Sequence, residues 1–292
     1  MTAPQAWDAG LSERLGEATI VAPLKAEIAG GAIEIVKRFG FAIVESPATE
    51  LTAAAIARRS DELLAFGAAL GAPVVQSPRR ELVEDVKDLS DIEDHDDRGY
   101  RSGGELSPHS DPPTLILLHC LQPARSGGES SLVSVASIVE RMRQSNPALV
   151  DELFTPLPDW RVAGQGGITA EGPAPKHRPV LTQHDGVLSC VLYRPFIERA
   201  AETIGAPLSG AQVAALDLFE ECSRSDQLTL RFVLQPGQTL VLHNRSVLHA
   251  RTDFVDWPEL DRRRHLLRMW IDAPATFPVH PDHGLGDFFA PT

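Results

Sequence analysis

The sequence predicts a mainly β protein with flanking helices, in the α+β class, whose core is an antiparallel sandwich or jelly roll. Short apolar runs separated by turn residues fill the later two-thirds of the chain, and this pattern is typical of such sheets. The first seventy residues instead mix helical and strand periodicities. Hydrophobic residues make up 43% of the 292 residues, which is ample for a sizeable core.

The N-terminal elements follow from periodicity and turn residues. Apolar positions at helical spacing predict a helix over residues 24–38, which Gly40 ends. The run Phe41 to Glu45 predicts a short buried strand, and the Ala- and Leu-rich stretch 49–70 predicts a second helix. The acidic stretch 81–97 is expected to form a solvated loop, because charge runs usually face water.

The later elements are predicted to be mostly strands. In chain order we expect strands over 114–120 and 130–135, a helix over 137–144, a hairpin of 180–183 and 187–193 about His184-Asp185-Gly186, a helix over 208–222, a hairpin of 228–234 and 239–242 about Pro236-Gly237, and a strand over 265–271. The Gly- and Pro-rich stretch 164–175 has no periodicity and predicts a lid loop near 161–178. Because no repeat or linker divides the chain, we expect a single domain, residues 1–292, in which an N-terminal α/β part (1–97) packs on a core formed by 98–273.

Charge and composition restrict the classes of partner that the protein can bind. The 27 Lys and Arg against 40 Asp and Glu give a net charge of −13, which disfavours binding to nucleic acid or to anionic membranes. The N-terminal stretch has no signal-peptide pattern, and the longest nearly uncharged apolar run, 112–124, is far shorter than a bilayer span. The three cysteines are too widely spaced for a disulfide framework or a zinc knuckle. We expect a cytoplasmic protein with a small-molecule substrate, and the sequence predicts no oligomeric state.

The motif His-x-Asp occurs three times, at 95–97, 109–111 and 280–282. With ten histidines about one copy is expected by chance, so the motif alone is a weak signal. Only His109 and Asp111 immediately precede a predicted buried strand, where residues i and i+2 point the same way and can bind one ion.

A third ligand is expected from a distant strand. His249 lies 249 − 109 = 140 residues further on, a separation that suits opposite ends of a jelly roll. His243 is the rival, interpreted as an ordinary histidine at the end of a strand. Two imidazoles and one carboxylate on one face of a metal leave three open positions, which is the facial triad of non-haem Fe(II) oxygenases.

Two arginines follow the third ligand. In a period-2 strand Arg264 and Arg268 share one face, whereas Leu267, Met269 and Ile271 share the other. A basic pair aimed inward beside a metal suits a dicarboxylate, because guanidinium binds carboxylate in a bidentate manner. The alternative interpretation is a solvated basic strand edge.

These motifs together resemble the taurine catabolism dioxygenase (TauD/TfdA) family, in its clavaminate synthase-like branch. The resemblance covers roughly residues 98–273. It is carried by blocks in the family's order: Arg98-Gly99-Tyr100-Arg101-Ser102 to Glu105, His109-Ser110-Asp111, Gly127-Gly128-Glu129-Ser130, Asn244-Arg245 to Leu248-His249-Ala250-Arg251-Thr252, and Arg264 with Arg268.

The resemblance implies a double-stranded β-helix (jelly roll) core that holds Fe(II), with 2-oxoglutarate and O₂ as co-substrates. His109, Asp111 and His249 would bind the iron. Ser130, where relatives often have Thr, and Arg264 would bind the distal carboxylate of 2-oxoglutarate. Arg268 matches a position that contacts 2-oxoglutarate in some members and an anionic substrate in others, so its role stays open.

The implied reaction is oxidation, most often hydroxylation, of an aliphatic C–H in an amino acid, an organic acid or a natural-product intermediate, with release of succinate and CO₂. Desaturation, epoxidation and cyclisation are variants. The presence of Asp111 argues against the halogenating relatives, in which a small residue vacates that position. Two alternatives stay open: a cupin-type metal-dependent hydrolase or isomerase, and a catalytically inactive metal-binding member.

Overall fold

The computed structural model describes residues 7, 13–76, 80–91, 103–159 and 176–285. The helices are α1 (Ala29–Phe39), α2 (Ala53–Leu70), α3 (Val135–Ser145), α4 (Pro147–Glu152), α5 (Arg194–Thr203) and α6 (Gly210–Ser223), with short 3₁₀ turns at Glu13–Ala18, Ala26–Ile28 and Pro281–His283. The strands are β1 (Thr19–Val21), β2 (Phe41–Glu45), β3 (Ala72–Val74), β4 (Val83–Val86), β5 (Leu106–His109), β6 (Leu115–Gln122), β7 (Ser126–Gly127), β8 (Ser130–Ser134), β9 (Pro156–Asp159), β10 (Lys176–Pro179), β11 (Leu181–His184), β12 (Val187–Cys190), β13 (Thr229–Phe232), β14 (Gln238–His243), β15 (Val247–Arg251), β16 (Phe254–Val255) and β17 (His265–Asp272). The chain therefore has the mixed α+β character that its sequence predicts.

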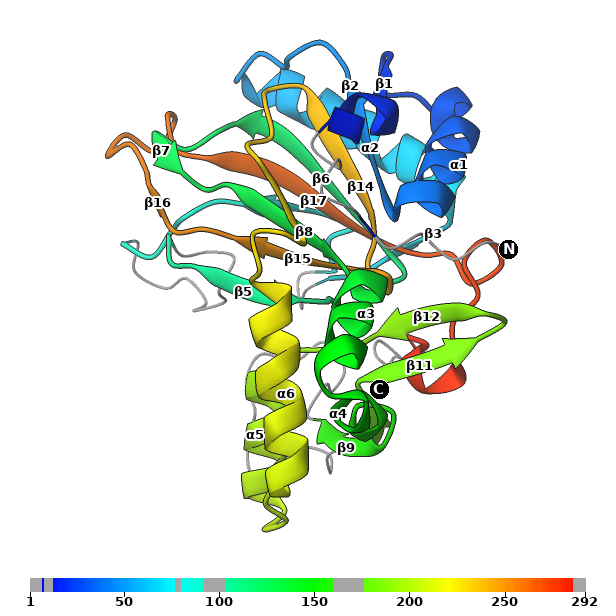
Figure 1. Cartoon of the computed structure of the whole chain (residues 1–292). Helices are drawn as coiled ribbons and strands as arrows, with labels where there is room; N and C mark the ends of the chain where they lie inside the picture. The colour runs from blue at the N-terminus through cyan, green and yellow to red at the C-terminus, as the bar shows by residue number, and fades with distance from the viewer. Residues whose placement is uncertain (1–6, 8–12, 77–79, 92–102, 160–175, 286–292) are drawn as a thin grey trace.

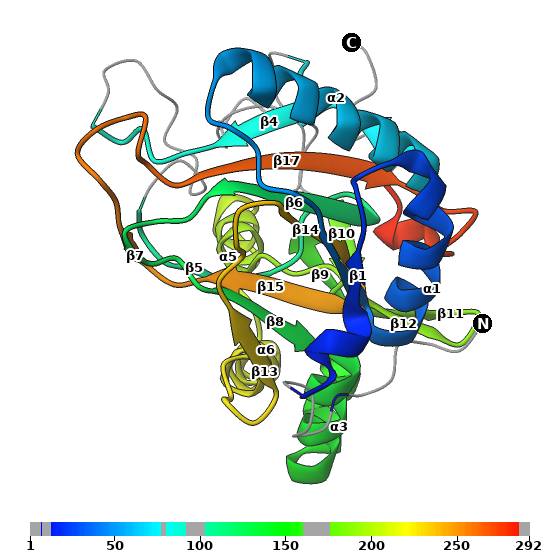
Figure 2. The same cartoon turned by 90° about the horizontal axis from the view of Figure 1, so that it is seen from above.

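Two sheets form the centre of the molecule. The larger has seven strands, in the order β1-β2-β14-β6-β17-β3 with β4 also paired to β17, and the smaller has four, in the order β13-β8-β15-β5. Helices α1 and α2 cover the outer face of the larger sheet, whereas α3 to α6 lie beyond the end of the smaller one (Figure 1). The view from above shows the two sheets stacked against each other (Figure 2). Strands from both sides of residue 97 share the larger sheet.

A hydrophobic core fills the space between the sheets. It joins side chains of β6, β14 and β17 to side chains of β8, β13 and β15, namely Ile116, Leu240, Leu266 and Trp270 with Leu132, Leu230 and Val247. Fully burying a side chain of this kind contributes about 1.5–3 kcal/mol to the free energy of folding, so this core stabilises the packing of the two sheets against each other. A second cluster packs the other face of the larger sheet against α1 and α2.

The sequence patterns explain where the elements begin and end. Helix α1 ends at Gly40, whose φ of 81° is the left-handed conformation that glycine adopts without strain. Thr52 caps α2 by accepting a hydrogen bond from the Ala55 N–H, and Ser209 opens α6 in a capping box with Gln212. The helices predicted over 24–38, 49–70, 137–144 and 208–222 are confirmed, with shifts of a few residues at their ends.

The strand predictions are confirmed where the apolar pattern is strong. Strands β2, β6, β8 and β17 match the runs predicted at 41–45, 114–120, 130–135 and 265–271, with shifts of one or two residues at their ends. The hairpin of β11 and β12 is confirmed as well, and its turn residues Asp185 and Gly186 have φ values of 49° and 78°, as a two-residue hairpin turn requires.

Two predictions of local structure are wrong. The expected hairpin of 228–234 and 239–242 does not form, because β13 pairs with β8 in the smaller sheet while β14 pairs with β2 and β6 in the larger. The turn at Gly237 carries the chain from one sheet to the other, and its N–H donates to the Cys120 carbonyl. The acidic stretch is also not a loop throughout, because Val83–Val86 form β4 and Glu84 is buried opposite Arg268.

Several predicted features lie outside the described residues. These are His95, the block 98–102 and most of the predicted lid loop, residues 160–175. Among the described residues, no helix combines the length and the apolar character needed to cross a membrane.

Candidate metal centre

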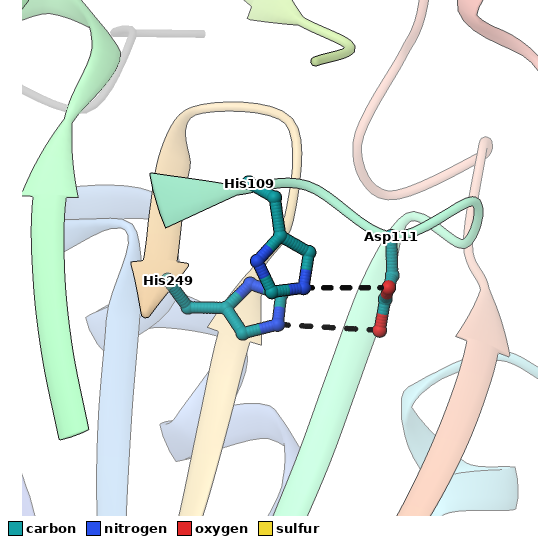
Figure 3. Close-up of side chains that lie close together, drawn as sticks. All are labelled: His109, Asp111 and His249. Carbon is teal, nitrogen blue, oxygen red and sulfur yellow. Dashed lines mark ion pairs between the residues drawn. The ribbon is translucent and has the colours of Figure 1, made fainter. Parts of the chain in front are cut away.

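The structure brings His109, Asp111 and His249 together. His109 is the last residue of β5, Asp111 lies in the connection to β6, and His249 is on β15 directly opposite His109. One nitrogen of each imidazole and one carboxylate oxygen all lie within 4.8 Å of one another. The Nε2 atom of His109 is 3.8 Å from Asp111 Oδ1, and that of His249 is 4.0 Å from Asp111 Oδ2 (Figure 3).

Both imidazoles present a nitrogen suited to a metal. The Nδ1–H of His109 is placed to donate to the Ser107 carbonyl at 2.7 Å, which leaves the Nε2 lone pair directed toward Asp111. Burial lowers the pKa of His249 to about 3, with a further contribution from His109. His249 is therefore neutral at physiological pH, which is the form that binds a cation.

A network of hydrogen bonds holds the segment that carries Asp111. The Ser110 N–H donates to the Leu192 carbonyl, and the Leu192 N–H donates to Ser110 Oγ, both at 3.0 Å. The Asn244 side chain accepts from the Asp111 N–H at 3.1 Å and donates to the carbonyls of Asp111 and Pro113. The neighbouring Arg245 guanidinium donates to the Asp111 carbonyl at 2.8 Å. The position of Asp111 thus depends on this clamp rather than on a continuous strand from His109.

Arg268 also lies near Asp111. Its Nη1 is 3.9 Å from Asp111 Oδ2, its Nη2 is 3.0 Å from Glu84 Oε2, and its Nε donates to Gln76 Oε1 at 2.8 Å. Both Arg268 and Glu84 are buried.

Arg264 occupies a different environment. Its side chain lines a small cavity together with Gly128, Ser130 and apolar side chains, namely Cys120, Pro123, Ala124, Val233, Leu234 and Leu266. Arg264 is 6% exposed, and no carboxylate of the described residues comes within 4 Å of its guanidinium. Burial lowers the pKa of Arg264, and burial together with the nearby Arg264 charge lowers the pKa of Arg251 to about 10. A buried guanidinium without a carboxylate is a ready site for an anion.

Arg268 lies on β17 and Arg264 immediately precedes that strand, and the Arg264 side chain lies beside Leu266 on the side that faces the core between the sheets. Leu267, Met269 and Ile271 pack against the helices on the other face. The arginine face is not uniformly polar, however, because Leu266 and Trp270 on it belong to the core between the sheets. The alternative interpretation as a solvated strand edge is wrong, since both guanidinium-bearing side chains are buried.

The rival histidines do not join the cluster. His243 is buried, its Nδ1 lies 2.7 Å from Ser246 Oγ, and its ring stacks on Phe277. His280 caps the short 3₁₀ turn near the C-terminus by accepting from the Asp282 N–H.

The donor set fits Fe(II). Two imidazoles and one carboxylate whose ligand atoms lie close together match the facial triad, which leaves coordination positions for small ligands. The cavity with Arg264 and Ser130 offers a charge and a hydroxyl for a carboxylate.

Comparison with known proteins agrees with this chemistry. Residues 9–270 match the family model described as the taurine catabolism dioxygenase TauD, TfdA family. The chain belongs to this family. It is an Fe(II)- and 2-oxoglutarate-dependent dioxygenase, as the sequence resemblance implied.

Similar proteins within the family act on varied molecules. FR-33289 synthase of Streptomyces rubellomurinus is 28% identical over 80% of this chain and 69% of its own length. A uridine-5'-phosphate dioxygenase of a Streptomyces species is 27% identical over 83% of this chain and 89% of its own. Human gamma-butyrobetaine dioxygenase is 26% identical over 58% of this chain, which spans only 44% of that protein.

Solved structures share the fold at low identity. An asparagine oxygenase in complex with Fe(II), 2S,3S-3-hydroxyasparagine and succinate has a TM-score of 0.61 at 18% identity, covering 96% of this chain and 85% of that one. The non-haem iron oxygenase OrfP, in complex with iron and alpha-ketoglutaric acid, has a TM-score of 0.61 at 15% identity, covering 91% and 85%.

Sequence reasoning missed two residues near the site and the contacts of a third. Gln76 and Glu84 hold Arg268, and neither stood out, because Glu84 sits in an acidic stretch that looks solvated. Asn244 was part of a recognised motif, but its contacts with the Asp111 segment become visible only in the structure. The available signal was its place five residues before His249.

Proposed function

We propose that His109, Asp111 and His249 bind Fe(II), and that this dioxygenase oxidises, most often by hydroxylation, an aliphatic C–H of a small molecule. The observation that carries the proposal is that His249, 140 residues after His109 in the chain, meets His109 and Asp111, with one ligand atom of each side chain within 4.8 Å of the others. Only among them do the described residues gather a group of metal-binding side chains.

We further propose that Arg264 and Ser130 bind the distal carboxylate of 2-oxoglutarate. Both line one cavity, and the Arg264 guanidinium there has no carboxylate partner among the described residues. A guanidinium and a hydroxyl together provide several directed donors for a carboxylate. Their cavity walls are largely apolar, which strengthens an ion pair formed inside.

The bound iron and co-substrate supply the oxidising chemistry, with succinate and CO₂ as products. The protein positions the metal ligands and sets their surroundings. The Asn244 and Arg245 contacts hold the backbone at Asp111, from which its carboxylate reaches toward both imidazoles. The Ser107 contact keeps the Nε2 lone pair of His109 turned toward the metal position.

We base the proposed substrate class on the relatives. The named relatives and structural neighbours include an asparagine oxygenase, gamma-butyrobetaine dioxygenase and uridine-5'-phosphate dioxygenase. We expect a polar metabolite of comparable size, such as an amino acid, an organic acid or a natural-product intermediate. Tyr193, whose ring centre lies 6.0 Å from that of His109, would border it.

We also propose that the two stacked sheets are a double-stranded β-helix core and that the chain is a single domain. The shared core between β6, β14 and β17 on one side and β8, β13 and β15 on the other supports both points. The strands β1 to β4 of the N-terminal part extend the larger sheet of that core.

Single alanine variants of the triad test the proposal. Anaerobic Fe(II) titration should show strongly weakened binding in His109→Ala, Asp111→Ala and His249→Ala. Succinate formation that requires both Fe(II) and 2-oxoglutarate should fall to background in each.

His280→Ala is the matched control, because that histidine also pairs with an Asp two residues on but lies at the protein surface. It should bind Fe(II) normally. Full activity in His249→Ala would refute the ligand assignment and direct attention to His243. Turnover of a substrate without succinate would instead favour a cupin-type hydrolase or isomerase.

A further inference from the structure

The cavity that contains Arg264 lies between the two central sheets (Figure 2). The larger sheet contributes Cys120 of β6 and Leu266 of β17, which are direct cross-strand partners, and the smaller sheet contributes Ser130 of β8. The Arg264 side chain is buried among them, and no carboxylate of the described residues comes within 4 Å of its guanidinium. A thiol and a hydroxyl thus line the cavity together with this buried charge.

Strand register places the cavity beyond the metal centre. Asp111 precedes β6, whereas Cys120 lies near the far end of that strand. On the smaller sheet His249 is paired with Leu132, and Ser130 lies two residues further along β8. Two residues of a strand span about 7 Å, so the hydroxyl lies a short chain length away from the metal-binding imidazole. This is where the distal end of a short dicarboxylate bound at the metal would arrive.

Small residues surround the guanidinium inside this cavity. Gly128 has a φ of 70°, and a Cβ added there would lie 3.5 Å from Arg264 Nε and 3.6 Å from Ala124 Cβ. Ala124 and Cys120 line the same space. Of these three, only Cys120 lies on a long central strand and carries an atom beyond Cβ. Its sulfur therefore takes up room at the guanidinium that a single substitution can release.

The Cys120 thiol leaves the charge of Arg264 available. Burial raises the pKa of this thiol to about 12, and the nearby Arg264 charge lowers it only in part. The sulfur is therefore protonated at physiological pH and forms no ion pair with the guanidinium. A neutral thiol is only a weak hydrogen-bond donor, so its main effect on a bound carboxylate is the volume that it occupies.

We propose that Cys120 limits the length of the 2-oxo diacid that this cavity accepts, so that the protein selects 2-oxoglutarate over 2-oxoadipate, which is one methylene longer. This inference rests on the proposed role of Arg264 and Ser130 in binding the distal carboxylate. The longer acid has to place its carboxylate deeper, in the space that the sulfur fills. One methylene in a packed pocket changes binding by about 10–200-fold.

Anaerobic calorimetry with both acids tests the proposal. Each acid is titrated into the Fe(II)-loaded parent protein and into Cys120→Ala, which lacks the sulfur. The parent should prefer 2-oxoglutarate by about 10–200-fold, and the variant should reduce this preference by about tenfold through tighter binding of 2-oxoadipate. A general loosening of the core would weaken both acids alike, so the ratio of the two dissociation constants is the measurement that decides.

Cys120→Val changes the volume in the opposite direction. It should weaken 2-oxoglutarate binding by about tenfold or more while the Fe(II) affinity stays unchanged, and it keeps the proposal testable if Cys120→Ala does not fold by circular dichroism. Cys222→Ala is the matched control. Cys222 is also a buried cysteine, but it lies on α6 in the core formed with α3, away from the cavity. It should leave the preference between the two acids unchanged.

Three results would overturn the length selection: a parent protein that binds both acids equally, a folded Cys120→Ala with the parent's preference, or a folded Cys120→Val with the parent's affinity for 2-oxoglutarate. Arg264→Ala in the same titration separates this inference from the proposed function. If Arg264→Ala loses affinity for 2-oxoglutarate while the Cys120 variants behave like the parent, only the length selection fails. If Arg264→Ala binds 2-oxoglutarate like the parent, the proposed co-substrate site itself fails.

Discussion

Removing the guanidinium of Arg264 should selectively weaken 2-oxoglutarate binding. The side chain is 6% exposed and lines a cavity whose walls are mostly apolar, so a carboxylate bound there forms a desolvated, charge-assisted pair. Breaking a buried pair by removing one partner costs about 3–5 kcal/mol. At about 1.4 kcal/mol per decade, Arg264→Ala should weaken 2-oxoglutarate binding by two to three orders of magnitude.

The assay is anaerobic calorimetry of 2-oxoglutarate binding to the Fe(II)-loaded protein, followed by succinate formation at increasing 2-oxoglutarate. Arg264→Lys should restore only part of the affinity, because an ammonium lacks the planar fork of donors. Arg263→Ala is the matched control. That neighbouring arginine is bound to Asp91 through both Nη atoms at 2.6 Å and takes no part in the cavity.

One result would refute this reasoning. If Arg264→Ala keeps its affinity for 2-oxoglutarate while the half-saturation constant for the primary substrate rises steeply, Arg264 binds the substrate. The co-substrate role would then pass to Arg268, against the carboxylates that already surround it.

Two further predictions follow from the clamp and from the buried histidines. Asn244→Ala should lower the unfolding free energy by about 1–3 kcal/mol, measured by urea unfolding, because buried backbone groups of 111–113 lose their partner. It should also weaken Fe(II) binding by about 10–100-fold, measured by anaerobic titration. The control is Asn146→Ala, which should change neither quantity because the Asn146 side chain caps no helix. Burial lowers the pKa of His243 to about 3, from an ordinary value of about 6.5. Below pH 6.5 the unfolded chain therefore takes up a proton that the folded chain does not, so the stability that neutral His243 contributes is complete above pH 6.5 and is lost as the pH falls toward 3. At pH 5 this loss is about 2 kcal/mol, and His243→Asn should show a correspondingly shallower fall in urea stability between pH 7 and 5; an equally steep fall would contradict the assignment.

The sequence predicted best those elements whose local pattern and tertiary environment agree. The strand 41–45 is apolar and buried over its first four residues, and the helix over 24–38 ends at a glycine that adopts the left-handed conformation. The residues of the proposed iron site could be predicted because a short motif, a strand and a distant histidine occur in a family's order. Each of these patterns lies in a short segment or adds to the others, so a single sequence is enough to recognise them.

The missed elements depend on partners far along the chain. Strand β5 (Leu-Ser-Pro-His) has no apolar alternation, and its place is decided by pairing with β15. Strand β4 carries two acidic residues, and the burial of Glu84 depends on a partner 184 residues away, Arg268, which lies opposite it. The hairpin expected about Gly237 failed for the same reason, since the two strands have better partners in separate sheets.

The two arginines show why a residue's role is not carried by its position in a motif alone. Arg264 and Arg268 are equivalent in type, lie on one face of one chain segment and are both buried. What differs is the ion pair that β4 provides to Arg268. Among the described residues no carboxylate comes within 4 Å of the Arg264 guanidinium, although the nearby Asp256 acts to raise its pKa. A guanidinium that is already balanced has little to gain from another anion, whereas an unbalanced one stabilises any carboxylate that reaches it. The ion pair from β4 therefore supports Arg264, rather than Arg268, as the proposed site for the distal carboxylate of the co-substrate.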